Sequence, residues 1–402
     1  MTILANLTTK LAAALLAPLL FTACASVRVP APPPATQLFS DAAFKPASEP
    51  VGAADLFTLS PAMRAYLNSP AFMSQVRLKG AQHGLVAALY QKGELKLEYE
   101  STRTRTAAET YDARVGNCLS LVVMTAAFAR ELGVPVTYQN VMVDHTWSRA
   151  GNLYFGSSHV NLVLTEAAPE FQRIYSNVRA TLTIDFLRPK DSDDFITHPL
   201  EERDIVAMYL NNRAAEALAQ ERIDDAYWWA REAVSQNPGF VTGYNTLAVV
   251  YQRRGETALA ERVFRAALDR EPENTVVMHN LVPVLAALGK TDESNQIKAR
   301  LAVIEPHPPF YYFNRGMTAM EKGDFEGARK LFAKEVKRAP YYHEFHFWLG
   351  IAHWRLGDGR SAHAELKLAL DTSTTNASSQ RYSAKLSQLK GGPSALTGKR
   401  LH

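Results

Sequence analysis

Four prolines in the second half of the chain stand at a constant interval, and this interval constrains the fold more than any other feature. They are 34 residues apart each time: Pro238, Pro272, Pro306 and Pro340. A small residue precedes each of them by 12 positions: Ala226, Ala260, Ser294 and Ala328. Proline lacks the amide hydrogen that continues an α-helix, so the period predicts repeated helix pairs from residue 201 onward. Such pairs bury their apolar faces only by stacking on one another.

The residues between the prolines resemble the tetratricopeptide repeat. In the second unit, large and small side chains alternate as that repeat requires: Tyr244, Leu247, Ala248, Tyr251, Ala260, Phe264 and Ala267. The third unit departs at Lys298, where an aromatic residue is expected, and a fifth unit has Thr374 in place of the proline. The resemblance implies an all-α solenoid of about five repeats with a capping helix over residues 201–390, whose concave groove takes a protein or peptide partner.

The beginning of the chain resembles a bacterial lipoprotein signal. Its apolar run, LAAALLAPLLF, is too short to span a bilayer, and small residues stand before Cys24, where cleavage is expected. The resemblance implies a signal peptide over residues 1–23, lipidation of Cys24, and a protein anchored on the periplasmic side of the outer membrane. An ordinary secretory signal with an incidental cysteine is the alternative. Residues 24–50 are rich in Pro and Ala and predict an extended tether.

Length and charge limit the remaining possibilities. A chain of 402 residues is longer than one ordinary core supports. The net charge of +4, without a dense run of Lys or Arg, argues against a nucleic-acid partner. Over residues 51–200, helical patterns mix with alternating segments such as NLYFGSSHVNLVLTE, which are typical of strands. These residues therefore predict an α+β domain, and residues 391–402 predict a frayed tail.

Cys118 is one of only two cysteines in the chain, and it opens an apolar run, LSLVVMTAAFAREL, with helical spacing. Gly133 follows where a C-terminal cap belongs. Unpaired amides and the helix dipole at a helix start favour the reactive thiolate and can hold an oxyanion. If Cys24 carries lipid, Cys118 has no intrachain disulfide partner, and an unused thiol in an oxidising compartment is a liability.

A thiolate nucleophile needs a base and a group that orients the base. His159 begins one alternating segment and Asp185 lies in the next, between apolar neighbours that make an unpaired carboxylate costly. The block RVGNC followed by a helix, and the order cysteine, histidine, aspartate, resemble the transglutaminase-like superfamily of papain relatives over roughly residues 75 to 190. The resemblance implies an α+β papain-like fold with Cys118, His159 and Asp185 as catalytic residues. Val160 and Asn161 replace the family's usual Ala-Trp.

Alternatives to these roles remain open at this point. Cys118 could be a small buried hydrophobe. His145, in the polar segment VDHTWSR, is a rival base, although an orienting aspartate on an adjacent strand favours His159. For the side-chain donor of an oxyanion hole the candidates are equivalent: Gln91, Asn117 and Gln139.

Two hypotheses for function follow. The first is a membrane-anchored enzyme that transfers acyl groups from amide bonds of proteins or peptides to water or an amine, with the solenoid recruiting the substrate. It requires neither a metal nor an organic cofactor, and the sequence has no phosphate loop or metal-ligand cluster. The second is a non-catalytic repeat lipoprotein that serves as a binding or assembly factor. A thiol redox role is disfavoured because no second cysteine lies nearby.

Overall fold

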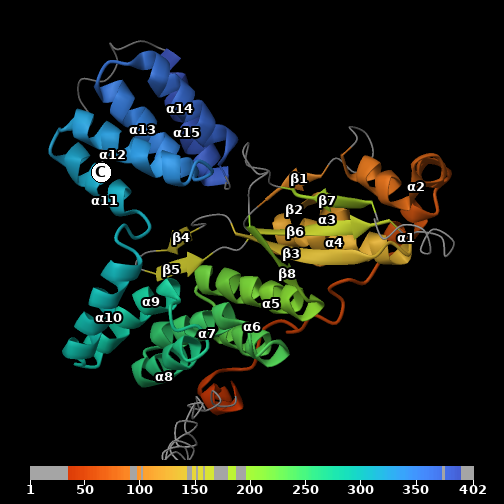
Figure 1. Ribbon diagram of the computed structural model, residues 1–402, viewed down its shortest axis with the longest axis horizontal. Coiled ribbons are helices and arrows are strands. Elements are labelled where there is room, and N and C mark those ends of the chain that lie inside the picture. The colour runs from red at the N-terminus through yellow and green to blue at the C-terminus, as the bar shows by residue number, and fades with distance from the viewer. Residues whose placement is uncertain are drawn as a thin grey trace, which may run out of the picture. The chain divides into compact units, whose positions relative to one another are not determined.

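The computed structural model describes residues 35–90, 97–100, 103–142, 147–150, 153–156, 159–166, 180–186, 196–373 and 376–390. The helices of the first part are η1 (Ala35–Leu38), η2 (Asp41–Ala43), α1 (Pro61–Leu67), α2 (Pro70–Tyr90), α3 (Ala107–Ala113) and α4 (Cys118–Glu131). Its strands are β1 (Glu98–Tyr99), β2 (Val115–Gly116), β3 (Val136–Met142), β4 (Trp147–Ala150), β5 (Leu153–Gly156), β6 (His159–Thr165), β7 (Thr181–Ile184) and β8 (Ile196–Leu200). Figure 1 shows the arrangement of these elements.

The first part combines one buried helix with a small sheet. Strands β7, β6, β3 and β8 form an antiparallel sheet in that order, and β6 pairs with β3 so that Asn161 lies opposite Gln139. Helix α4 packs against β6 and β3 (Figure 1). Every residue of α4 from Leu119 to Ala129 is buried, so this helix is the centre of the α+β unit.

Both ends of α4 follow from local sequence. Asn117 is the N-cap, and its side chain accepts a hydrogen bond from the amide of Ser120. After the helix, Gly133 adopts a left-handed φ of 68°, and the amide of Val134 bonds back to the carbonyl of Ala129 at 2.8 Å. The prediction that Cys118 opens a helix capped near Gly133 is therefore confirmed.

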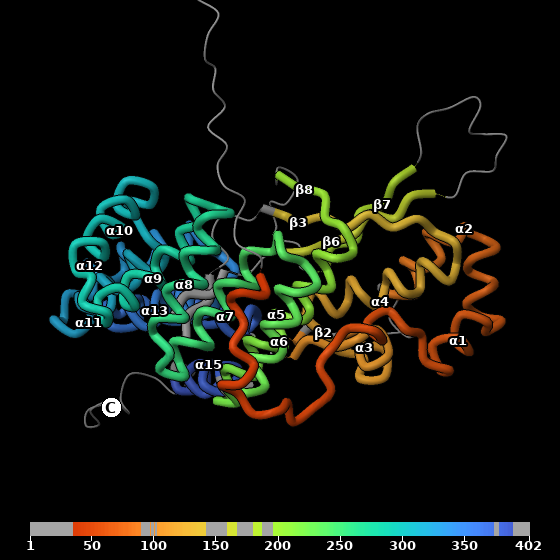
Figure 2. Tube along the Cα trace, turned by 90° about the horizontal axis from the view of Figure 1, so that it is seen from below, coloured from red at the N-terminus to blue at the C-terminus, as the bar shows by residue number. Residues whose placement is uncertain are grey.

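The segment before α1 is not an extended tether where the structure describes it. From residue 35 it runs along the first repeat helices, as Figure 2 shows. Leu38 and Phe44 are buried, and the ring of Phe44 stacks on Tyr227 with centroids 3.8 Å apart. The hydroxyl of Tyr251 donates to the carbonyl of Leu38 at 2.8 Å. The tether prediction over 24–50 is wrong for residues 35–50, because these two apolar anchors outweigh the Pro/Ala-rich composition; residues 24–34 lie outside the described part.

The predicted helix pairs are present in the second part. They are α5 (Glu202–Ala219), α6 (Ile223–Gln236), α7 (Val241–Arg254), α8 (Thr257–Leu268), α9 (Thr275–Ala287), α10 (Thr291–Ile304), α11 (Tyr311–Glu321), α12 (Phe325–Arg338), α13 (His343–Arg355) and α14 (Gly359–Asp371), followed by α15 (Asn376–Lys390). The four small residues before the prolines are all buried, none more than 1% exposed. Gly316 lies so close to the ring of Phe332 that a methyl group there would come within 2.6 Å of it. Small side chains therefore allow the paired helices to approach closely, as the spacing predicts.

The turn inside each pair repeats with the same period. Gly255, Gly289, Gly323 and Gly357 all have left-handed φ values, between 75° and 89°. The corresponding residue of the first pair is Glu221, with φ of 59°. Each turn thus needs a conformation that glycine adopts without steric cost, and the first pair meets the same need with a glutamate.

The apolar core divides within the repeats. One core runs from Leu38 through α4 and the sheet to Leu285 on α9, and a second begins at Phe310 and ends at Ala352. Between them, α10 buries only Ser294 and Leu301. Uniform stacking of the five pairs predicts one continuous core, but the structure has two. The cause is the polar sequence of α10, which includes Lys298 at the position expected to be aromatic. The first core also crosses the domain boundary predicted at residue 200.

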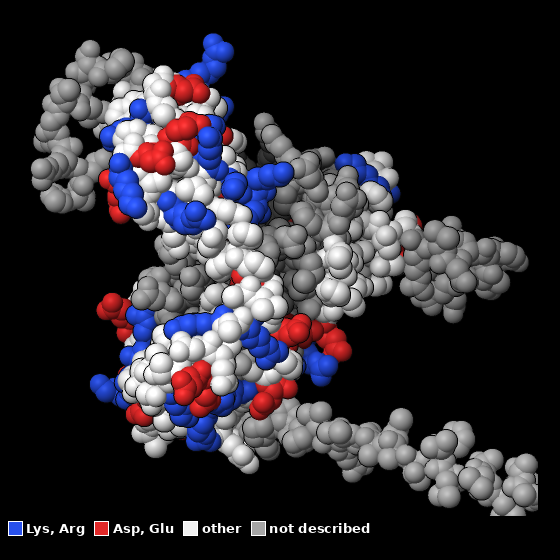
Figure 3. Space-filling model, turned by 60° about the vertical axis from the view of Figure 1, so that its left-hand side comes forward, with Lys and Arg blue, Asp and Glu red and all other residues white. Residues whose placement is uncertain are grey.

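Charge is mixed on the outside of the repeats. Figure 3 shows Lys and Arg side chains interspersed with Asp and Glu on the face in view. Some of these pair across helices, as Lys290 does with Glu261 at 2.7 Å. Over the described ranges, no helix combines the length and the hydropathy needed to cross a membrane.

Candidate functional site

The predicted nucleophile occupies the first position of α4. Asn117 caps the helix immediately before Cys118, and the thiol is free and partly exposed. The helix dipole and the unpaired amides of the first turn both point toward this position. Cys118 therefore lies where a helix start favours a reactive thiol, and its side chain is partly buried against the first core.

His159 and Asp185 meet as the order of strands predicts. His159 is the first residue of β6, and Asp185 directly follows β7, its neighbour in the sheet. The Nε2 atom of His159 lies 2.7 Å from a carboxylate oxygen of Asp185, and both side chains are over nine-tenths buried. The Cys118 thiol lies close enough to the imidazole to act on its pKa. Because Asp185 engages Nε2, the other ring nitrogen, Nδ1, is left for sulfur. The structure thus brings the three predicted residues together.

The electrostatics of His159 follow from these contacts. Burial acts to lower the pKa of the imidazole, but its hydrogen bond to Asp185, the neighbouring Cys118 thiol and the negative charge of Asp185 outweigh burial and raise the pKa to about 9. At neutral pH the imidazole therefore favours its cationic form beside the carboxylate. A cationic imidazole stabilises a neighbouring thiolate and can later deliver a proton to a leaving amine.

The oxyanion candidates separate in the structure. The amide side chain of Asn117 accepts from the amide and the hydroxyl of Ser120 and donates to the hydroxyl of Thr104 at 2.8 Å. It is a buried capping residue and not a free donor. Gln139 lies opposite Asn161, which shares a face of β6 with His159 because side chains alternate along a strand. Asn161 is 5% exposed, and its Oδ1 has no hydrogen-bond partner among the described residues.

Several sequence predictions lie outside the described residues. They are Cys24 with the signal peptide over 1–23, the rival base His145, the candidate Gln91, and the tail over 391–402. Among the described side chains, no cluster of three or more His, Cys, Asp or Glu is placed to hold a metal ion.

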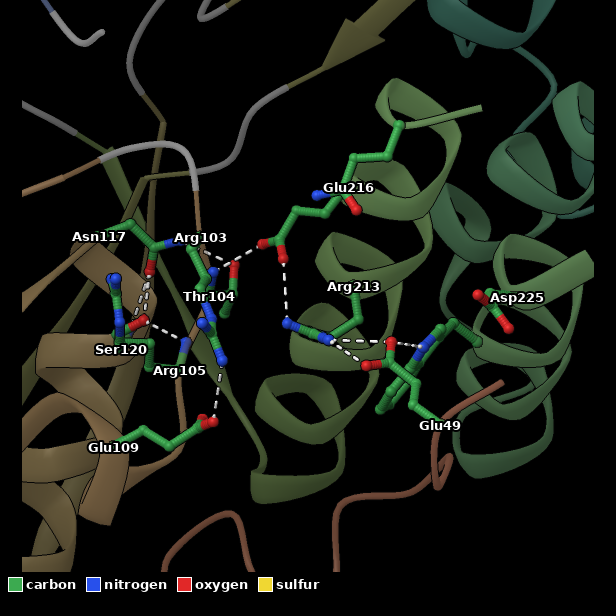
Figure 4. Close-up of polar contacts among 12 residues, drawn as sticks. Glu49, Arg103, Thr104, Arg105, Glu109, Asn117, Ser120, Arg213, Glu216 and Asp225 are labelled. Carbon is green, nitrogen blue, oxygen red and sulfur yellow. Dashed lines mark hydrogen bonds and ion pairs between the residues drawn. The ribbon is translucent and has the colours of Figure 1, made fainter. Parts of the chain in front are cut away.

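Sequence analysis missed the polar contacts that hold the first turn of α4. Figure 4 shows Asn117 facing Thr104 and Ser120 facing Arg105, and Thr104 in turn faces Glu216 of α5. The spacing of Asn117 and Ser120, with the acceptor three residues before the amide, is a capping signal that the sequence does contain. The contact with Glu216 joins residues 112 positions apart, and no local pattern indicates it.

Comparisons with known proteins bear on the repeats. No family model matches the chain. Among curated proteins, the heat shock protein sti1 homolog of Schizosaccharomyces pombe is 25% identical over 139 residues, which is 33% of this chain and 22% of that protein. The chain therefore spans less than a quarter of the length of this relative.

Two solved structures are similar to parts of the chain. YrrB, described as a TPR protein with an unusual peptide-binding site, has 18% identity and a TM-score of 0.25 over 44% of this chain and 92% of that one. Pseudomonas aeruginosa pilF has 18% identity and a TM-score of 0.28 over 48% and 96%. The 34-residue period and the helix pairs themselves make the second part of the chain a helical repeat that resembles the tetratricopeptide type.

Proposed function

We propose that the protein is a cysteine-dependent acyl-transfer enzyme that acts on amide bonds of proteins or peptides. Cys118 is the nucleophile, His159 the base and then the acid, and Asp185 the orienting group. The single observation that supports this is the buried pair of His159 and Asp185, 2.7 Å apart, with the Cys118 thiol close enough to act on the imidazole. A buried aspartate on an imidazole that contacts a thiol at a helix start is an expensive arrangement for a structural role.

The reaction follows from the geometry. The Cys118 thiolate attacks the amide carbonyl, and the C–S bond forms as the carbonyl oxygen becomes an oxyanion. The amide of Ser120 is taken by Asn117, which leaves the amides of Cys118 and Leu119 to stabilise that oxyanion. His159 donates its proton to the leaving nitrogen as the C–N bond breaks. Water or an amine then attacks the thioester, His159 takes up the proton of this acceptor, and the thiolate leaves.

As part of this proposal, we assign the α+β unit that contains these three residues to the transglutaminase-like superfamily. This assignment is supported by the RVGNC block, the strand order of His159 and Asp185, and the helix-on-sheet arrangement around α4. Hydrolysis is preferred over transamidation through the resemblance to bacterial members only. No cofactor or metal is required by this chemistry. The comparisons with known proteins give it no support, so it rests on geometry and motif.

A second candidate function rests on the repeats. In this view the solenoid binds a protein or peptide partner as an assembly factor, and the α+β unit is a scaffold. The helix-pair fold favours a binding role, which is compatible with either view of Cys118. Lipidation of Cys24 would hold the protein on the periplasmic side of the outer membrane. Replacement of Cys24 by Ser is expected to release it from the membrane fraction, and retention there would count against the anchor.

Thiol reactivity tests the enzyme proposal without a known substrate. At pH 6 we expect iodoacetamide to alkylate Cys118 at least about tenfold faster in the folded protein than in urea, because a cationic imidazole beside the sulfur favours the reactive thiolate. Cys118→Ala supplies the background rate and should keep the helical circular-dichroism signal. Equal alkylation rates in the folded protein and in urea would exclude the nucleophile role and leave the binding role. Capture of a partner by the Cys118→Ala protein would then identify what the repeats bind.

A further inference from the structure

The first turn of the nucleophile's helix is tied to the first repeat helix by a continuous series of hydrogen bonds. Asn117, the N-cap, donates to the hydroxyl of Thr104 at 2.8 Å. The backbone amide of Thr104 donates to a carboxylate oxygen of Glu216 on α5 at 2.6 Å. On the other side, the amide of Arg105 donates to the hydroxyl of Ser120 at 2.9 Å. Figure 4 shows these side chains converging from α4, the 103–105 segment and α5.

Glu216 is itself held on the repeat side. Its second oxygen lies 3.3 Å from Arg213, one turn earlier on α5. Arg213 bonds both carboxylate oxygens of Glu49, at 3.0 and 3.2 Å, and Glu49 also accepts from the indole of Trp229 on α6. The segment before α1, α5 and α6 therefore fix the position of Glu216 before it reaches Thr104.

Burial makes this link costly to maintain without a purpose. The side chain of Glu216 is 16% exposed, and Thr104 is 1% exposed. Burial raises the pKa of the Glu216 carboxyl despite the hydrogen bonds from Thr104. By contrast, burial of Glu49 is outweighed by the hydrogen bond from Trp229 and by Arg213, so its pKa is lowered. A buried carboxylate that accepts a backbone amide fixes the direction of that amide closely.

We propose that Glu216 is a positioning residue for the Cys118 nucleophile, acting from the repeat domain through Thr104 and Asn117. This inference rests on the proposed function. An N-cap sets where the first helical residue points, and that residue is Cys118. When Glu216 is removed, the 103–105 segment keeps its contact with Ser120 but loses its contact with α5. Thr104 then no longer has a fixed position for Asn117, and we expect the thiol to shift from its place beside His159. Even a small displacement of the sulfur weakens a site whose reacting groups must keep a fixed geometry.

Variants of the full chain test the link at two points. Glu216→Ala removes the acceptor, whereas Thr104→Val keeps the shape of a buried residue and removes only the hydroxyl. The second variant leaves α5 intact and so covers the case in which the first fails to fold. Glu232→Ala, on α6, is the matched control because Glu232 pairs only with Gln236 among the contacts described. In each protein we would measure hydrogen exchange over residues 114–124 and the pH profile of Cys118 alkylation.

For both variants we expect faster exchange around Ser120 and, near pH 6, alkylation slowed by about tenfold, as loss of a buried hydrogen bond implies. Glu232→Ala should match the wild type. Unchanged exchange in both variants would overturn the link whatever Cys118 does. Faster exchange with an unchanged alkylation profile would overturn the positioning role while the proposed function stands. If the wild-type profile is that of an unfolded thiol, the proposed function fails, and faster exchange in the variants still supports the link.

Discussion

The helical repeats are determined by local, periodic sequence features, whereas the candidate site of the α+β unit depends on contacts between segments distant in the chain. In the repeats, small residues, prolines and turn glycines recur every 34 positions, and each contact of a helix pair is made within a short stretch of chain. In the α+β unit, the candidate site joins Cys118, His159 and Asp185 across three elements. A periodic region can lose one contact and keep its fold, whereas the site loses its chemistry when any member moves.

The two regions nevertheless share one core as far as α9, and the division falls inside the repeats. The first repeat helices therefore belong physically with the α+β unit, and α11 to α13 pack around a core of their own. We expect Asp185→Asn to affect the chemistry of the first region, and Gly316→Ala in the second core to affect stability without affecting chemistry.

The largest effect is expected from Asp185→Asn. The amide keeps the shape of the side chain but removes the charge that orients His159 and holds it cationic. We expect amide turnover to fall by about 10³-fold, measured on any substrate that the wild type cleaves. Asp112→Asn, on the exposed side of α3, is the control. A loss of less than about tenfold would mean that Asp185 has a structural role only.

The same variant has a pH signature. The folded pKa of His159, about 9, lies above its unfolded value of about 6.5. The stabilisation from the imidazolium is therefore complete below about pH 6.5 and is lost as pH rises through about 9. NMR titration of the imidazole should give a midpoint near 9 in the wild type and a lower one in Asp185→Asn. An ordinary midpoint in the wild type would contradict the ion-pair account of the site.

These differences explain how much the sequence alone could predict. The helix pairs follow from Pro238 and its successors, and the start of α4 follows from Cys118 with Gly133, because caps and periods are local. The strand order that joins His159 to Asp185 was accessible from the order of the motifs. The burial of Leu38 and the reach of Glu216 to Thr104 were not, because both depend on which distant surfaces meet.

Gly316→Ala tests whether the second core is independent of the first. A methyl group at Gly316 would stand 2.6 Å from the buried ring of Phe332. We expect Gly316→Ala to lower the free energy of unfolding by about 1–2 kcal/mol, since overpacking outweighs the gain in helix propensity, and to leave Cys118 alkylation unchanged. Urea unfolding followed by tryptophan fluorescence measures the first effect.

Gly359→Ala is the matched control for this change, because nothing lies within 4 Å of a methyl group at that position. It should be neutral or slightly stabilising. If Gly316→Ala also slows alkylation, the two cores are coupled, and the separation of the two regions drawn from the packing is wrong.

The smallest expected effect concerns the one turn that departs from the repeat. Glu221 holds a left-handed φ of 59°, where the four later turns have glycine. A left-handed backbone costs a non-glycine residue about 1 kcal/mol, which glycine would relieve. The greater conformational freedom of glycine in the unfolded chain offsets part of this gain in stability. We therefore expect Glu221→Gly to raise the free energy of unfolding by about 0.5 kcal/mol, whereas Gly255→Ala, at φ of 89°, should lower it by about 1 kcal/mol. Because Glu221 lies in the unit that shares its core with α4, shifts of opposite sign would show that the repeat rule extends into the first core. Destabilisation by Glu221→Gly would instead show that the Glu221 side chain stabilises the fold by more than its backbone strain costs. The first turn would then be determined by packing with the α+β unit and not by the repeat.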